Sequence, residues 1–230
     1  MDKNRITAVL LAAGSGTRMN LGLTKQRLQI KGKSVLLRSL EAFENCEAVT
    51  DIVLVVREEE KELFLSEIKS ISKLRKIVAG ADSRIGSARC GFSAIDYPCD
   101  YVAIHDAARC LIKPQMITKV VNDACRYGAA SASSVVVDTV KRVDENGFVI
   151  STENRDYLRL AGTPQIFKYE LYEKALYDAT TSEVSVTDDN MLMERIGARV
   201  YMTDVGKNNL KITYAEDVLL AEHILEQENE

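Results

Sequence analysis

The stretch Ile-Thr-Ala-Val-Leu-Leu-Ala-Ala-Gly-Ser-Gly-Thr-Arg, residues 6–18, decides how this 230-residue chain folds. Residues 6–12 form a short, mostly apolar run, and Gly14 follows it closely. This pattern is typical of a strand that is buried on both faces. Gly14 and Gly16 let the backbone approach a ligand closely, and exposed N–H groups after a strand form an anion-binding concavity. The stretch predicts a buried strand that ends in an anion-binding loop, although a plain tight turn has the same composition.

The same alternation of apolar and amphipathic segments continues to residue 137. It predicts an α/β fold: a Rossmann-like, mostly parallel twisted sheet with helices on both faces. Ligands bind such sheets beyond the carboxyl ends of the strands, so the loops at 12–18, 80–84 and 106–109 should gather there. Further strands are expected at 51–56, 76–79, 100–104 and 132–137, and helices at 35–43, 58–71 (Leu63, Phe64 and Ile68 inward), 83–95 and 115–127.

The pattern changes after residue 138. Asn146-Gly147 lies between two short β-prone runs, which is a strong hairpin signal. We expect one domain over residues 1–230 with a β-hairpin arm at about 138–158. The chain should return through 163–165 to helices at about 168–179 and 187–196, a strand at 199–203 and a last helix at 215–227.

Composition excludes several classes of function. The net charge is −4 and there is no basic stripe, so we expect no nucleic-acid partner. No apolar run reaches the roughly 18 residues of a membrane span, and we expect no signal peptide. Five irregularly spaced cysteines and two histidines do not make a zinc site. Free thiols fit a cytoplasmic protein.

Two cations follow the glycine-rich loop. The loop lacks the Gly-Lys-Ser/Thr of a Walker A motif and the third glycine of a dinucleotide fingerprint. Arg18 and Lys25 follow instead, a fork-shaped cation and a point charge suited to a triphosphate attacked at its α-phosphorus. Each is equally compatible with a solvated surface charge.

Two further loops carry polar residues directly after strands. Asp82 or Ser83 would cap the helix that begins there, or the loop and Ser87 would surround a base and ribose. Asp106 and Arg109, separated by two alanines, would touch a metal-bound phosphate, a sugar hydroxyl or a phosphate, or would pair with each other.

These segments in this order resemble one family, the 2-C-methyl-D-erythritol 4-phosphate cytidylyltransferases. The resemblance spans about residues 6–225, and its specificity lies in the ordered set rather than in any one motif. The segments are Leu11–Met19, Lys25-Gln26, Gly80–Arg84, Asp106–Arg109, Asp138–Lys141, Thr163–Gln165, Thr187-Asp188 and Asn209–Lys211.

The resemblance implies a nucleotide-diphospho-sugar transferase fold and a reaction of CTP with methylerythritol phosphate, with Mg²⁺ held mainly by the CTP phosphates. It implies a homodimer with exchanged arms, so that Arg155 and Thr163 serve the partner's site. It assigns catalysis to Arg18, Lys25, Arg155 and Lys211. Substrate-binding positions would be Ala12, Ala13, Gly14, Ser15, Gly16, Ala81, Asp82, Ser87, Asp106, Arg109, Thr163 and Thr187, with Asp106 a further candidate for metal.

Three positions depart from the family pattern. Cys110 stands where proline is common, Asn190 where a small residue is usual, and Ala81 where glycine is frequent. The related ribitol-5-phosphate cytidylyltransferases are the alternative, and the 138–141 and 152–155 segments favour the methylerythritol enzyme.

Overall fold

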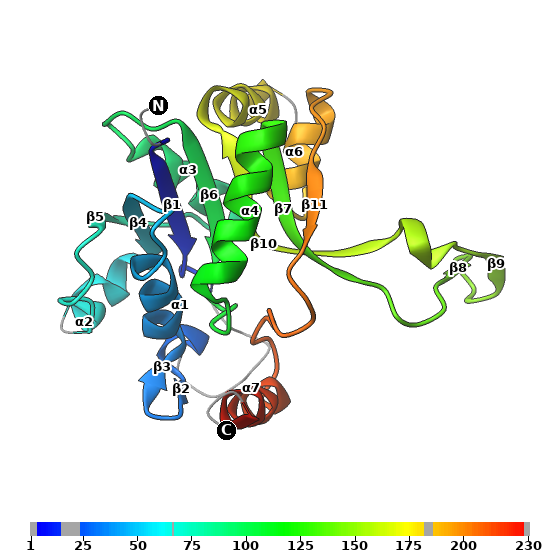
Figure 1. The fold of residues 1–230 in the computed structure, drawn as a ribbon, viewed down its shortest axis with the longest axis horizontal. Coiled ribbons are helices and arrows are strands. Elements are labelled where there is room, and N and C mark those ends of the chain that lie inside the picture. The colour runs from blue at the N-terminus through cyan, green and yellow to red at the C-terminus, as the bar shows by residue number, and fades with distance from the viewer. Residues whose placement is uncertain (1–3, 15–23, 66, 182–185, 228–230) are drawn as a thin grey trace.

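The computed structural model describes residues 4–14, 24–65, 67–181 and 186–227. A seven-stranded sheet forms its centre, in the order β11-β7-β10-β6-β1-β4-β5 (Figure 1). The strands are β1 (Ile6–Leu11), β4 (Asp51–Val56), β5 (Leu74–Ala79), β6 (Tyr101–Asp106), β7 (Ala129–Val135), β10 (Arg159–Lys168) and β11 (Tyr201–Asp204).

The sheet is mostly parallel, as the alternation of segments predicts. Strand β1 pairs in parallel with β4 and β6, and β4 pairs in parallel with β5. Strand β10 runs antiparallel to both β6 and β7. It contains residues 163–165, for which the sequence predicts a connection, so the chain passes through the middle of the sheet there.

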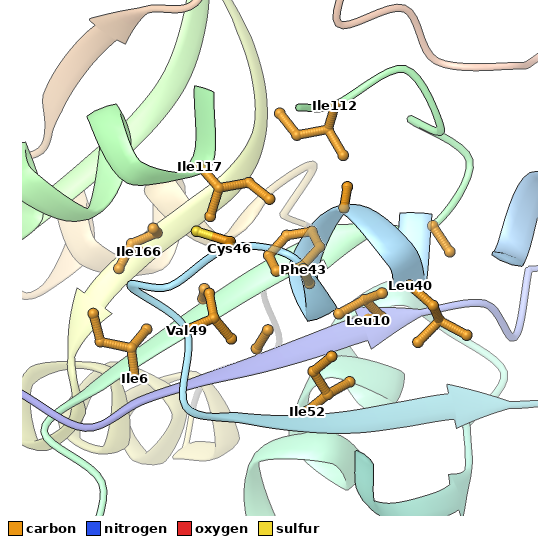
Figure 2. Packing of buried hydrophobic residues seen from close by; sticks show 14 of the residues in the cluster. Ile6, Leu10, Leu40, Phe43, Cys46, Val49, Ile52, Ile112, Ile117 and Ile166 are labelled. Atoms are coloured by element: carbon orange, nitrogen blue, oxygen red, sulfur yellow. The ribbon is translucent and has the colours of Figure 1, made fainter. Parts of the chain in front are cut away.

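Helices cover both faces of the sheet. Alternate residues of β1 separate the two sides: Ile6, Ala8 and Leu10 belong to one buried cluster, and Val9 and Leu11 to the other. The first side carries α1 (Val35–Glu44) and α4 (Pro114–Tyr127), and the second carries α3 (Arg84–Ser93), α5 (Tyr169–Thr181) and α6 (Asp189–Arg195). Figure 2 shows side chains of the first cluster.

A third, smaller cluster lies beside α7 (Glu216–Gln227). It joins that helix to the short hairpin of β2 (Gln29–Ile30) and β3 (Lys33–Ser34), through Ile30 and Ala221. No helix in the described ranges is long and apolar enough to cross a membrane.

The predicted long helix at 58–71 is wrong. The chain forms a 3₁₀ turn, η3 (Glu58–Glu60), and a four-residue helix, α2 (Lys61–Phe64). Phe64 and Ile68 are buried as expected, but Leu63 is 49% exposed. Beyond the segment the backbone N–H groups of Ser72 and Lys73 donate to the Glu44 carboxylate at 3.0 Å each. Tertiary contacts of this kind override a helical pattern in a short segment.

The hairpin arm is confirmed. Strands β8 (Lys141–Val143) and β9 (Val149–Thr152) pair antiparallel, and Gly147 in their turn has φ 87°. The arm leaves the sheet between β7 and β10 and projects far from it (Figure 1). Several of its apolar side chains are exposed, among them Phe148, Ile150 and Tyr157.

Helix α3 packs close to the sheet near its C-terminal end, at Gly91. A Cβ at Gly91 would lie 2.3 Å from Val9 Cγ1 and 2.7 Å from Val55 Cγ2. Both neighbours are fully buried branched side chains on the sheet.

We therefore expect Gly91→Ala to destabilise the fold by about 1–3 kcal/mol, although alanine is the better helix former. The matched control is Ser93→Ala, at an exposed position of the same helix. The free energies of unfolding from urea titrations give the comparison. A Gly91→Ala variant as stable as the control would contradict the close packing.

Candidate active site

A cavity of about 580 Å³ opens beyond the carboxyl ends of β1, β5 and β6. The described part of the first predicted loop, residues 12–14, reaches this cavity together with the loops at 80–84 and 106–109. The cavity is lined by Leu11, Ala13, Gly14, Lys25, Gln26, Arg57, Glu58, Glu59, Gly80, Ala81, Asp82, Ser83, Arg84, Ser87, Asp106, Ala108 and Lys211.

The loop after β5 is held by two serines. Ser83 caps α3 by accepting the Gly86 N–H at 3.0 Å, which confirms the capping alternative for Ser83. The Ser87 hydroxyl accepts the Ala81 N–H and donates to the Ala81 carbonyl, at 3.1 Å each. Ser87 thus fixes the backbone of Ala81, while Asp82 stays at the cavity wall.

Lys25 lies at the cavity wall in a 3₁₀ turn, η2 (Lys25–Arg27). Its two chain neighbours are anchored. The Thr24 hydroxyl donates to Glu60 Oε1 at 2.6 Å, and the buried Gln26 amide donates to the Gly14 carbonyl at 3.5 Å. Ala13 and Gly14 line the cavity, whereas Ala12 is fully buried and donates its N–H to Val55. Ser15, Gly16 and Arg18 lie outside the described residues.

The Asp106 carboxylate joins two cations at the end of β6. Its Oδ1 accepts from Arg84 Nε at 3.1 Å and its Oδ2 from Lys211 Nζ at 2.7 Å. Burial alone would raise the pKa of Asp106, but Arg84 and Lys211 hold it well below its usual value. The Asp106–Arg109 ion pair that the sequence left open is therefore wrong: Asp106 pairs with Arg84 and Lys211, and the Arg109 guanidinium donates to backbone carbonyls.

A second cavity, of about 230 Å³, lies on the other side of Lys211. Arg109 lines it rather than the first cavity, and its guanidinium donates to the Asn209 carbonyl at 2.8 Å. Lys207 and Gly162 also line it, and Arg109, Lys207 and Lys211 make its wall basic. Lys211 lines both cavities and so stands between them.

Three predicted residues are not at either cavity. Thr163 is 3% exposed and its hydroxyl accepts the Asp106 N–H at 3.0 Å, so it supports the end of β6 within its own chain, and its service to a partner's site stays a prediction. The Thr187 hydroxyl donates to the Met191 sulfur at 3.2 Å. Arg155 lies in η4 (Arg155–Tyr157), between β9 and β10. This part of the chain belongs to the arm, which projects away from the sheet (Figure 1).

The departures Cys110 and Asn190 also lie away from the cavities. Cys110 is 4% exposed within the α7 cluster. Asn190 is 5% exposed and donates to the Ser131 hydroxyl at 3.0 Å. The third departure, Ala81, offers its backbone to the larger cavity whatever its side chain.

The sequence pattern did not assign roles to Arg84 and Gln26, which line the larger cavity. For Arg84, its place in the sequence is the feature that could have indicated a role in the site. It directly follows the Ser83 cap, so its side chain starts at the strand-end edge of the sheet. No cluster of three or more His, Cys, Asp or Glu side chains suited to a metal occurs among the described residues.

Comparison with known proteins identifies relatives along the whole chain. Residues 6–227 match the family described as IspD, 2-C-methyl-D-erythritol 4-phosphate cytidylyltransferase. A protein of that name from Clostridium botulinum (strain Loch Maree / Type A3) is 40% identical over 229 residues, 99% of each chain. One from Caldanaerobacter subterraneus is 39% identical over 223 residues, 96% of this chain and 98% of the relative.

A solved structure agrees. The crystal structure of 4-diphosphocytidyl-2C-methyl-D-erythritol synthase from Anaerococcus prevotii superposes with a TM-score of 0.89 at 28% identity, over 98% of this chain and 100% of that one. The names of these three proteins specify the methylerythritol substrate or product, and none specifies ribitol phosphate.

His105, next to Asp106, gives the site a testable dependence on pH. Its Nδ1 lies 3.1 Å from the Thr163 hydroxyl, and burial lowers its pKa from 6.5 to about 3. The unfolded chain therefore takes up a proton below about pH 6.5 that the folded chain does not. The stability from a neutral His105 is fully present above that pH and is lost as the pH falls toward 3.

We expect His105→Gln to flatten the dependence of the unfolding free energy on pH between about 7 and 5. His223→Gln, at the exposed histidine on α7, is the control and should keep the wild-type slope. Urea titrations at several pH values measure the slopes. Equal slopes for wild type and His105→Gln would show that His105 titrates normally.

Proposed function

The chain belongs to the 2-C-methyl-D-erythritol 4-phosphate cytidylyltransferase family, and we propose that the two cavities divide that family's substrates between them. The enzyme is a nucleotidyltransferase that joins CTP and 2-C-methyl-D-erythritol 4-phosphate, giving 4-diphosphocytidyl-2-C-methyl-D-erythritol and pyrophosphate. The observation that carries the division is the position of Lys211 between the cavities.

CTP occupies the larger cavity in this proposal. The backbone of Ala13, Gly14, Ala81 and Asp82 faces cytosine and ribose, and Ser87 contributes by holding Ala81 in place. The triphosphate extends toward Lys25 and, by the family resemblance, toward Arg18. Arrangement of backbone groups and cations around developing negative charge is the main way such sites lower a barrier.

The acceptor phosphate enters from the smaller cavity, near Arg109 and Lys211. One of its oxygens attacks the α-phosphorus of CTP, a new P–O bond forms, and the bond from the α-phosphorus to the bridging oxygen breaks as pyrophosphate leaves. A phosphate monoester is already an anion at neutral pH, so the step needs alignment and charge neutralisation rather than a general base. Thr163 supports this arrangement through the Asp106 N–H.

Magnesium fits this site only together with the nucleotide. Each Asp106 carboxylate oxygen already accepts a hydrogen bond from a cation, so Asp106 is a poor metal ligand in this arrangement. We propose that Mg²⁺ is held by the CTP phosphates, where it would neutralise part of their charge.

The arm supports a homodimer. Phe148, Ile150 and Tyr157 of the arm are 73%, 63% and 86% exposed. A group of exposed apolar side chains usually marks an interaction surface. Exchange of arms across a twofold axis would carry Arg155 to the acceptor cavity of the partner, which its own chain does not allow. The free thiols of all five cysteines fit a reducing, cytoplasmic location.

Pyrophosphate release measured with four nucleoside triphosphates and two acceptors tests the reaction. We expect kcat/KM for CTP with methylerythritol phosphate to exceed every other pair by about 100-fold or more. Turnover of ribitol 5-phosphate in preference to methylerythritol phosphate would reverse the assignment of the acceptor.

Subunit mixing tests the exchanged arms. Lys25→Ala and Arg155→Ala should each lower kcat/KM by about 10²–10³-fold, while Lys174→Ala, an exposed lysine on α5, should not. Refolding the two inactive variants together should restore about a quarter of wild-type activity, because half the dimers are mixed and each has one intact site. No recovery in the mixture would mean that Arg155 acts within its own chain, and full activity of Arg155→Ala alone would mean that it has no role.

A further inference from the structure

A carboxylate with no access to either cavity lies behind the active site. Asp189, in the first turn of α6, is fully buried. Its Oδ1 accepts the Tyr172 hydroxyl at 2.6 Å and its Oδ2 accepts Arg84 Nη1 at 2.5 Å. Burial raises the pKa of Asp189, because the charged form is disfavoured away from water.

Arg84 divides its guanidinium between two carboxylates. Nη1 binds Asp189, and Nε binds only Oδ1 of Asp106. Arginine commonly binds one carboxylate with two parallel hydrogen bonds. Here that geometry would place Arg84 N–H groups on both oxygens of Asp106, and Lys211 Nζ would have to share Oδ2 with a second cation.

We propose that Asp189 is a positioning residue for Lys211. By holding one end of Arg84, it keeps Arg84 from binding Asp106 through both oxygens. Oδ2 of Asp106 then holds the Lys211 ammonium between the two cavities. The inference rests on the proposed function, because it gives Lys211 its place between the CTP and acceptor phosphates.

Stability alone is a weak explanation for this arrangement. A buried ion pair usually contributes little over well-packed apolar residues, because desolvation offsets the attraction. The charges alternate along the series Asp189, Arg84, Asp106 and Lys211, which runs from a fully buried carboxylate to a lysine at the cavity wall. Only the last member lines both cavities.

Asp189→Asn is the decisive variant, because it keeps the side-chain size and removes the charge that holds Arg84. Tyr172→Phe is the matched control: it removes the other hydrogen bond to the same carboxylate and leaves the contact with Arg84. We expect kcat to fall about 10- to 100-fold in Asp189→Asn, with KM for CTP within about threefold of wild type. In Tyr172→Phe, kcat should stay within about twofold of wild type. This should hold even if the thermal midpoint of Tyr172→Phe falls by as much as that of Asp189→Asn.

A double-mutant cycle with Lys211→Met separates positioning from general loosening. If Asp189 acts through Lys211, adding Asp189→Asn to Lys211→Met should change kcat by less than about twofold. The proposal would be overturned if the losses of kcat in Asp189→Asn and Lys211→Met multiply in the double variant. Equal losses of kcat in Asp189→Asn and Tyr172→Phe would overturn it as well. Should Asp189→Asn fail to fold, Arg84→Lys enters the same cycle, since a lysine cannot bridge both carboxylates.

Crystal structures of wild type and Asp189→Asn provide a readout that needs no turnover. We expect the variant to lose the contact between Lys211 Nζ and Asp106 Oδ2, and its retention would overturn the proposal. Absence of cytidylyl transfer by the wild type would instead refute the proposed function and leave this structural comparison intact.

Discussion

The carboxylate of Asp106, shared between Arg84 and Lys211, is the interaction on which the site depends. It stands at the end of β6, with β1 on one side and β10 on the other. Two cations on one buried carboxylate fix the ends of chain segments that are more than 100 residues apart, since Asp106 and Lys211 are separated by 105 positions. Buried ion pairs, as well as the apolar core, therefore hold distant segments of the chain together.

Strand β10 explains why that charge can be held so firmly. Because it runs antiparallel beside β6, it brings the Thr163 hydroxyl to the Asp106 backbone and His105 to Thr163. The arm is the excursion between β7 and β10, so its root is fixed by the same strand pair. A change in the pairing of β10 would move both the support of Asp106 and the direction of the arm.

The sequence predicted local features well and long-range partners poorly. The strands around residues 6 and 101, the Ser83 cap and the Asn146-Gly147 hairpin follow from short patterns, and all are present. Strand β10 was missed because Gly162 and Pro164 normally argue against a strand interior. The pairing of Arg84 with Asp189 was missed because no spacing rule connects residues 105 positions apart.

Both lysines at the larger cavity are held through their surroundings. Lys211 has a direct partner in Asp106. Lys25 has anchored neighbours, Thr24 on Glu60 and Gln26 on Gly14. A flexible lysine must lose side-chain freedom when it meets a phosphate, and that entropy opposes catalysis unless the fold has already restricted it. For a reaction whose nucleophile needs no activation, such restriction of cations is the main work left to the protein, and it accounts for buried charges that a stability argument alone leaves unexplained.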